Sequence, residues 1–137
     1  MRGLLIVTLC LTFRLFAPVY HASAATQATL NADACLELEN SNAEMKRIQR
    51  RIILDHNEEK RFVAAFRKAQ HAWIAFRDAQ LNAVYPESPK LYGSANVMCR
   101  CFVLNKLTRE RMETLKMWLS EDTEGDVCAG SMKRKNR

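Results

Sequence analysis

Glycine and proline are scarce in this sequence, with four and three residues among 137. These residues supply many of the tight turns that an all-β fold needs, so a turn-rich sandwich or barrel is disfavoured. No uninterrupted apolar run reaches the roughly 18 residues that cross a bilayer, which excludes a multi-span membrane protein. Apolar residues make up 48% and charged residues 26%, as in ordinary folded domains. We therefore expect one small all-α domain.

The sequence also lacks the motifs of common catalytic sites. It contains no G-x-S-x-G, phosphate-binding loop, H-E-x-x-H or C-x-x-C. Its carboxylates are spread at surface-pair spacing from Lys and Arg, and His71 is the only side chain that we would test for acid–base chemistry. Neither His56 nor His71 lies at ligand spacing from a cysteine. We expect no catalytic residue, no metal and no cofactor.

The first 24 residues predict an export signal. A positive start is followed by an apolar run, interrupted by Arg14, and then by small residues at Ala22 and Ala24. We place signal-peptidase cleavage after Ala24, and hence the protein in the periplasm or outside the cell. An uncleaved amphipathic N-terminus is the alternative. Leu9 before Cys10 does not suit lipid attachment, so no stable membrane anchor is expected.

Export changes the charge balance. Without Arg2 and Arg14 the chain holds 19 basic and 15 acidic residues, a net charge of +4, and residues 133–137 contribute four of the positive charges. The remainder is neutral, which argues against a nucleic-acid partner. An acidic stretch, residues 121–126, precedes this basic end. We expect residues 121–137 to form an irregular, mobile tail, with contact to anionic lipid or cell-wall polymer as the alternative.

Apolar residues at helical spacing predict three helices after a loose lead-in over residues 25–33. Asp33 can cap the first, and Asp55 with Glu58 forms a capping box for the second, which should end before Pro86. One continuous bent helix through Asp55 is the alternative. Gly93 and Ser94 are predicted to form a turn and to cap the third helix. The expected inner residues are Leu38, Met45, Ile48 and Ile52, then Phe62, Phe66, Ala69, Trp73, Gln80 and Val84 over 58–84, and Val97, Cys101, Leu104, Thr108, Leu115 and Leu119 over 95–119.

Short connections between these helices predict an antiparallel three-helix bundle. This order brings Cys35 to the end of the bundle that holds Cys99 and Cys101. Cys101 lies on the inner stripe, so a Cys35–Cys101 disulfide is preferred. A bond between Cys99 and Cys128 is the second candidate, and a free or intermolecular cysteine stays open.

Two motifs resemble a known family. Residues 69–79 read A-Q-H-A-W-I-A-F-R-D-A, and residues 107–115 read L-T-R-E-R-M-E-T-L. Together they resemble the LprI-type lysozyme-inhibitor family of small exported bacterial helical domains, over about residues 35–120. The resemblance assigns residues 34–120 to an LprI-like domain and implies a protein partner, a lysozyme-type hydrolase that is blocked by contact. The alternative is an envelope-binding or chaperone-like helical module with no hydrolase target.

The motif residues have a physical interpretation of their own. Gln70, Trp73 and Arg77 share one helix face, and Asp78 and Arg111 can join them in a clamp between helices. The alternative is that some of these side chains meet a ligand or a partner. The motif residues carried forward as structural or binding candidates are Gln70, Trp73, Arg77, Asp78, Thr108, Arg111 and Leu115.

Overall fold

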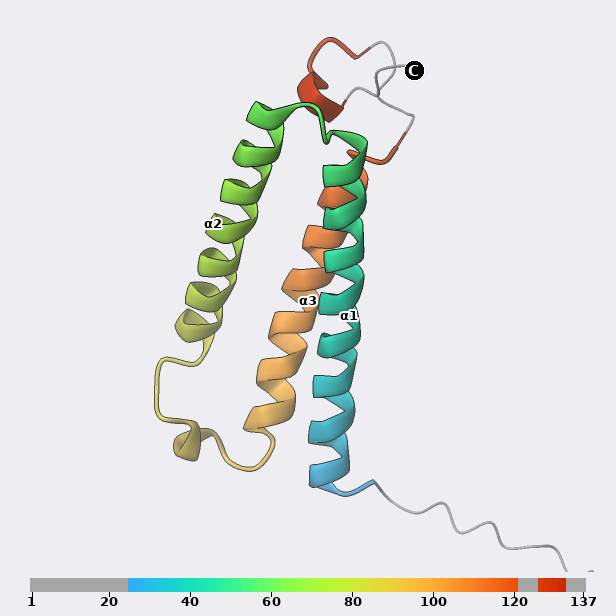
Figure 1. The fold of residues 1–137 in the computed structure, drawn as a ribbon. Helices are drawn as coiled ribbons and strands as arrows, with labels where there is room; N and C mark the ends of the chain where they lie inside the picture. The colour runs from blue at the N-terminus through green and yellow to red at the C-terminus, as the bar shows by residue number, and fades with distance from the viewer. Residues whose placement is uncertain (1–24, 121–125, 133–137) are drawn as a thin grey trace, which may run out of the picture.

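The computed structural model describes residues 25–120 and 126–132 of the chain. Within these residues there are three α-helices and no strand, which confirms the all-α bundle (Figure 1). The elements are α1 (Gln27–Asp55), α2 (Lys60–Val84), the 3₁₀ turn η1 (Pro89–Tyr92), α3 (Asn96–Lys116) and the 3₁₀ turn η2 (Gly130–Met132).

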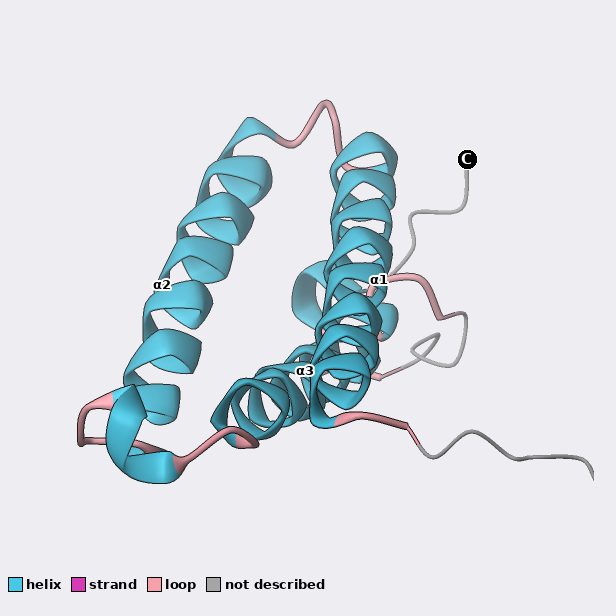
Figure 2. Cartoon of the chain, turned by 90° about the horizontal axis from the view of Figure 1, so that it is seen from below, coloured by secondary structure: helices cyan, strands magenta, loops and turns pink. Residues whose placement is uncertain are grey.

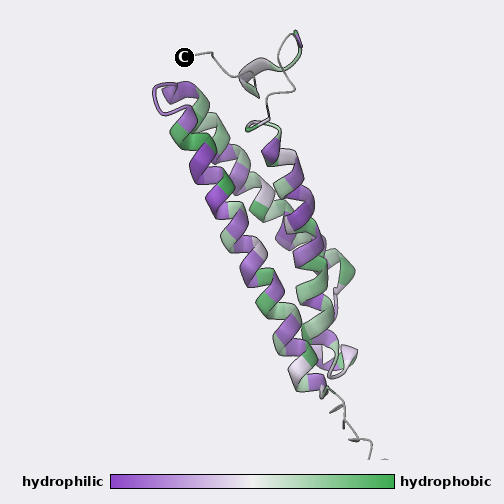
Figure 3. Cartoon of the chain, turned by 90° about the vertical axis from the view of Figure 1, so that its right-hand side faces the viewer, coloured by the Kyte–Doolittle hydropathy of each residue, from purple (hydrophilic) through white to green (hydrophobic). Residues whose placement is uncertain are grey.

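The helices run up, down and up, but they do not pack equally. α1 and α3 lie side by side along most of their length, whereas α2 leans away from this pair toward its C-terminal end (Figures 1 and 2). Each helix mixes hydrophilic and hydrophobic positions, as amphipathic packing requires (Figure 3). The pairing of α1 with α3 is therefore the main tertiary contact.

The first helix begins earlier than the sequence predicted. The Thr26 side chain accepts a hydrogen bond from the Thr29 amide at 3.2 Å and caps α1, so residues 27–33 are helical and not a lead-in. The reason is a tertiary contact. The Asn31 side chain donates to the Ser94 carbonyl at 3.1 Å and accepts from the Met98 amide at 3.2 Å, and so it ties the first turns of α1 to the start of α3.

The prediction that Asp55 and Glu58 form a capping box for the second helix is also wrong. Asp55 is the last residue of α1 and pairs with Arg51 at 3.1 Å. The chain leaves the helix at His56, whose buried ring lies 4.2 Å from that of Phe62 and bonds Glu59 at 3.1 Å. α2 then starts at Lys60 without a side-chain cap. A single continuous helix is excluded because residues 56–59 are not helical and the chain reverses direction there.

The connection from α2 to α3 follows the sequence more closely. α2 ends at Val84, just before Pro86, as predicted. Gly93 has φ +73°, a left-handed conformation that glycine tolerates best. Ser94 does not cap the third helix, because Ala95 takes that place and Asn31 of α1 binds the Met98 amide instead.

The hydrophobic core occupies the half of the bundle near the α1–α2 turn. Its buried members come from all three helices, and Phe62, Trp73, Trp118 and Leu119 pack around them. Some predicted inner residues lie outside it: Val84 and Val97 are 45% and 50% exposed, because α2 leans away there and Val97 lies in the first turn of α3, and Ala69 and Gln80 are exposed. The core residues are Met45, Ile48, Ile52, Phe66, Met112 and Leu115.

The preferred disulfide is present. Cys35 and Cys101 are bonded, with Cα atoms 5.1 Å apart and a sequence separation of 66. The Cys99–Cys128 bond is not formed, and both cysteines are free thiols. Cys99 is in the first turn of α3 and Cys128 follows its last, about 26 Å along the helix axis at about 1.5 Å per residue. Their separation along the bundle explains the difference.

The described part of the predicted tail contacts the bundle. Ala129 is buried, and the Trp118 indole donates to the Ser131 hydroxyl at 3.3 Å, which brings η2 back to the end of α3. Residues 126–132 consist of turns and the three-residue segment η2, so the predicted irregular structure is found there, and mobility of the tail stays a prediction. Residues 121–125 and 133–137, like the predicted signal peptide, lie outside the described residues. None of the helices in residues 25–120 is long and apolar enough to cross a membrane.

Replacing both Cys35 and Cys101 with serine should lower the free energy of unfolding by about 4 kcal/mol, because the bond closes a long loop of the unfolded chain. Urea denaturation of the oxidised protein measures the change. Serine at both Cys99 and Cys128 is the matched control and should change stability by no more than about 0.5 kcal/mol. Equal midpoints for the two double variants would contradict the assigned pairing.

Candidate functional site

Gln70 lies where the three helices meet. Its side chain is buried, and its Oε1 accepts from Gln49 Nε2 of α1 at 3.3 Å and from Arg111 Nε of α3 at 3.4 Å. Burial lowers the pKa of the Arg111 guanidinium, which nevertheless stays charged at neutral pH. Among the described residues, Gln70 Nε2 has no hydrogen-bond partner. One acceptor atom therefore holds two donors from different helices.

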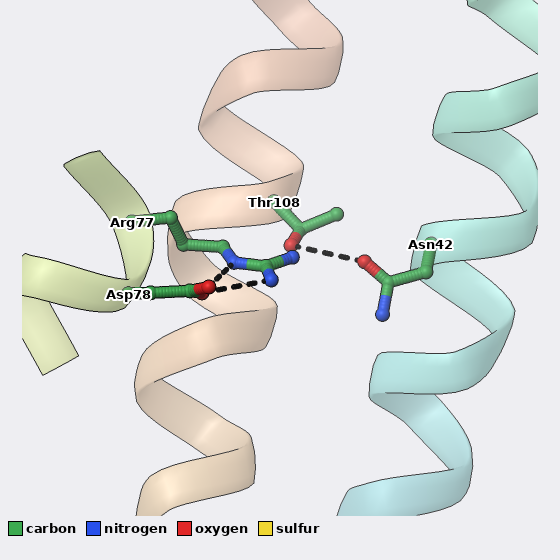
Figure 4. Close-up of polar contacts among 4 residues, drawn as sticks. All are labelled: Asn42, Arg77, Asp78 and Thr108. Atoms are coloured by element: carbon green, nitrogen blue, oxygen red, sulfur yellow. Dashed lines mark hydrogen bonds and ion pairs between the residues drawn. The ribbon is translucent and has the colours of Figure 1, made fainter. Parts of the chain in front are cut away.

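Trp73, Arg77 and Asp78 form a second group, on α2. The Arg77 guanidinium lies 5.5 Å from the Trp73 ring centroid and donates to Asp78 Oδ1 from both Nε, at 3.0 Å, and Nη2, at 2.9 Å. Figure 4 shows the Arg77 side chain extending from α2 toward α3. Trp73 packs against the core and Arg77 is largely covered, whereas Asp78 is exposed. The charge of Arg77 is therefore balanced by Asp78, its neighbour on α2, on the side of α2 that faces α3.

The second motif points toward α1. Thr108 is fully buried, and its hydroxyl donates to Asn42 Oδ1 at 3.5 Å (Figure 4). Leu115 is also fully buried, within the core. Both residues therefore fasten α3 to α1 and are not accessible to a partner.

The sequence did not predict the other polar contacts between α1 and α3. We call the line along which these two helices touch the α1–α3 seam. Asn105 Nδ2 donates to Glu37 Oε2 at 3.4 Å, one helical turn from the Thr108–Asn42 bond. Together with the bonds of Asn31, these polar pairs follow the α1–α3 contact from residue 31 to residue 42 of α1, whereas Gln49 farther along α1 bonds Gln70 of α2. The signal was present in the sequence, because these side chains fall on the same helical stripes as the apolar residues.

The motif side chains do not form an open site. Of the seven, Asp78 alone is exposed. A surface hollow of about 260 Å³ lies between α2 and α3, and none of the seven lines it. Its lining residues are Gln80, Val84, Val103, Lys106, Leu107 and Glu110. The interpretation of Gln70, Trp73, Arg77, Asp78 and Arg111 as a clamp stays a prediction, and this geometry favours it over direct contact with a ligand.

What the protein does present to solvent is charge, divided along α1. The first part of α1, residues 27–45, carries four carboxylates and no Lys or Arg, and residues 46–51 then carry four basic side chains and no carboxylate. Asp33, Glu37 and Glu39 are exposed, and Glu44 pairs with Arg47. We call residues 27–45 the acidic half of α1. Its charges oppose those of the other end of the same helix.

The remaining candidates add no reactive centre in the part of the chain that is described. His71 is exposed, and residues 25–120 and 126–132 hold no group of side chains that could bind a metal ion. Cys99 lies beside Tyr85, where partial burial and the neighbouring thiol raise the pKa of the phenol. Of the acidic stretch 121–126, only Asp126 is described, and it accepts from the Cys128 amide at 2.8 Å.

The sequence matches the model of a known protein family. The family described as lysozyme inhibitor LprI matches residues 20–115, more than half of the chain and including both sequence motifs. The chain therefore belongs to the LprI lysozyme-inhibitor family. No curated protein and no solved structure shows a significant match.

The three-helix contact at Gln70 gives a test of the clamp. Gln70→Met keeps the side-chain length but removes the acceptor, which leaves Gln49 and Arg111 unpaired, so we expect a loss of about 1–3 kcal/mol in the free energy of unfolding. Gln80→Met on the same helix is the control, because Gln80 is exposed, and should change stability little. Equal stability of the two variants would show that the shared acceptor is unimportant.

Proposed function

We propose that the mature protein is an exported, non-enzymatic inhibitor of a lysozyme-type cell-wall hydrolase, acting by protein–protein contact through the acidic half of α1. Family membership supports the class of partner. The position of the contact rests on one observation: Asp33, Glu37 and Glu39 are exposed within a stretch of helix that has no basic side chain. Export through the predicted signal peptide, cleaved after Ala24, is part of the proposal.

Net charge alone argues against such a complex. Many lysozymes are strongly basic, and a chain of net charge +4 gains no overall attraction to them. Charges act mainly within the Debye length, about 8 Å at physiological salt, so the local sign matters more than the total. A basic hydrolase that approaches residues 27–45 meets carboxylates first. The division of charge along α1 therefore removes the objection.

A second function is supported by a different feature. Several large apolar side chains of α2 and α3 remain exposed, and one of them, Val84, lines the hollow between these two helices. Such a surface would suit a chaperone-like or envelope-binding module that captures apolar segments. The exposed side chains are Ile74, Phe76, Val84 and Phe102. This candidate predicts capture of other proteins without inhibition of a hydrolase.

Neutralising the acidic half should weaken inhibition. In the triple variant Asp33→Asn, Glu37→Gln, Glu39→Gln we expect the inhibition constant for a basic lysozyme to rise about tenfold at low salt, since each exposed ion pair contributes on the order of 0.5 kcal/mol. The rate of cell-wall hydrolysis, measured against inhibitor concentration, gives this constant.

The matched control removes three carboxylates elsewhere: Glu58→Gln, Glu87→Gln, Glu113→Gln, all exposed. It should keep the inhibition constant within about twofold, because it has the same net charge but an intact acidic half. An equal loss in both variants would reject the assigned surface. No slowing of hydrolysis by the unmodified protein at tens of micromolar would reject the function for that enzyme.

A further inference from the structure

Positive charge is concentrated at the end of the bundle where α1 and α2 join. Residues 46–68 hold eight basic and three acidic side chains, a net charge of +5. The other residues between 25 and 132 hold seven basic and twelve acidic side chains, a net charge of −5. The neutral total of this part of the chain therefore conceals a strongly basic segment.

Most of this charge is free to act outside the molecule. Six of the eight basic side chains are exposed and form no ion pair within residues 25–120 and 126–132; Arg47 and Arg51 pair with Glu44 and Asp55. We call these six the basic end of the bundle. They are Lys46, Arg50, Lys60, Arg61, Arg67 and Lys68. All lie within about 14 Å of the α1–α2 turn along the helix axes, at about 1.5 Å per residue.

Three of them border the same contact between helices. Gln49 of α1 bonds Gln70 of α2 at 3.3 Å. Lys46 and Arg50 flank Gln49 on α1, and Arg67 lies one turn before Gln70 on α2. Because α3 covers the other side of this contact through Arg111, the exposed cations lie on the side open to solvent.

An apolar side chain accompanies these cations. Leu54 is 63% exposed, and it follows Arg47 and Arg50 at spacings of seven and four residues on the outer side of α1. The carboxylates nearest the turn are partly used inside the molecule, since Asp55 binds Arg51 and Glu59 binds His56. A soluble polyanion could bind this surface through the Lys and Arg side chains alone, without contact to an apolar residue. An exposed leucine among them suits a surface that has phosphate groups outside and hydrocarbon beneath.

We propose that the basic end of the bundle binds the surface of an anionic phospholipid bilayer, with its Lys and Arg side chains on the lipid phosphates and Leu54 at the boundary with the acyl chains. This binding is independent of hydrolase inhibition. It is peripheral and reversible, because it rests on surface charge and one apolar side chain.

Sedimentation with vesicles tests the proposal on the exported chain. Vesicles of equal parts phosphatidylglycerol and phosphatidylcholine should bind the protein, and vesicles of phosphatidylcholine alone should not. Lys46→Gln, Arg50→Gln, Arg67→Gln together should weaken binding roughly a hundredfold, because each cation at an anionic surface contributes about fivefold. The matched control Lys90→Gln, Lys106→Gln, Arg109→Gln carries the same net charge and should lose less than about fivefold.

Leu54→Asn separates a bilayer from a soluble polyanion. It should weaken vesicle binding about tenfold, through loss of apolar burial, and leave retention on heparin unchanged. The proposal is overturned if the two triple variants lose binding equally, if Leu54→Asn binds vesicles like the unmodified protein, or if heparin retains a chain that vesicles do not. Deletion of residues 133–137 should leave most of the binding; complete loss would assign it to those residues instead.

Discussion

The Cys35–Cys101 bond holds together the end of the molecule that the hydrophobic core does not reach. Core residues such as Ile52 and Leu115 lie toward the α1–α2 turn, whereas Cys35 and Cys101 join α1 to α3 near the opposite end. A domain of this size buries a modest apolar area, so a covalent link at the other end contributes a large share of its stability. Without it, the first turns of α1 would depend on a few polar contacts with α3, such as those of Asn31.

Polar pairs occupy the length between the disulfide and the core. Asn105 with Glu37 and Thr108 with Asn42 cross the seam at successive turns. Each pair contributes little net free energy, but a sliding of α3 along α1 would leave its buried members unpaired, at a cost of about 1–3 kcal/mol each. These contacts therefore fix the register of the two helices. α2 has fewer such constraints, which agrees with its lean away from the pair.

Features that depend on local sequence could be predicted, and features that depend on distant contacts could not. Pro86 ends α2 by its own chemistry, and the antiparallel order of three helices brought Cys35 near Cys101. The early start of α1 depends on Asn31 meeting the start of α3, and the break after Asp55 brings the His56 ring against that of Phe62 in α2. Likewise, the motif residues could be placed on one face, but only the tertiary structure shows that Gln70 serves two donors.

The division of charge along α1 connects the two proposals. A helix of 29 residues is about 44 Å long, several times the Debye length, so its acidic and basic parts act on their surroundings almost independently. Asp33, Glu37 and Glu39 lie about 24 Å or more from the α1–α2 turn along α1, so the field of a bilayer at the basic end hardly reaches their carboxylates. A basic hydrolase can therefore meet these carboxylates while the basic end of the bundle is on the membrane. Opposite charges on one rigid helix would thus allow a single small domain to bind a membrane and an enzyme together.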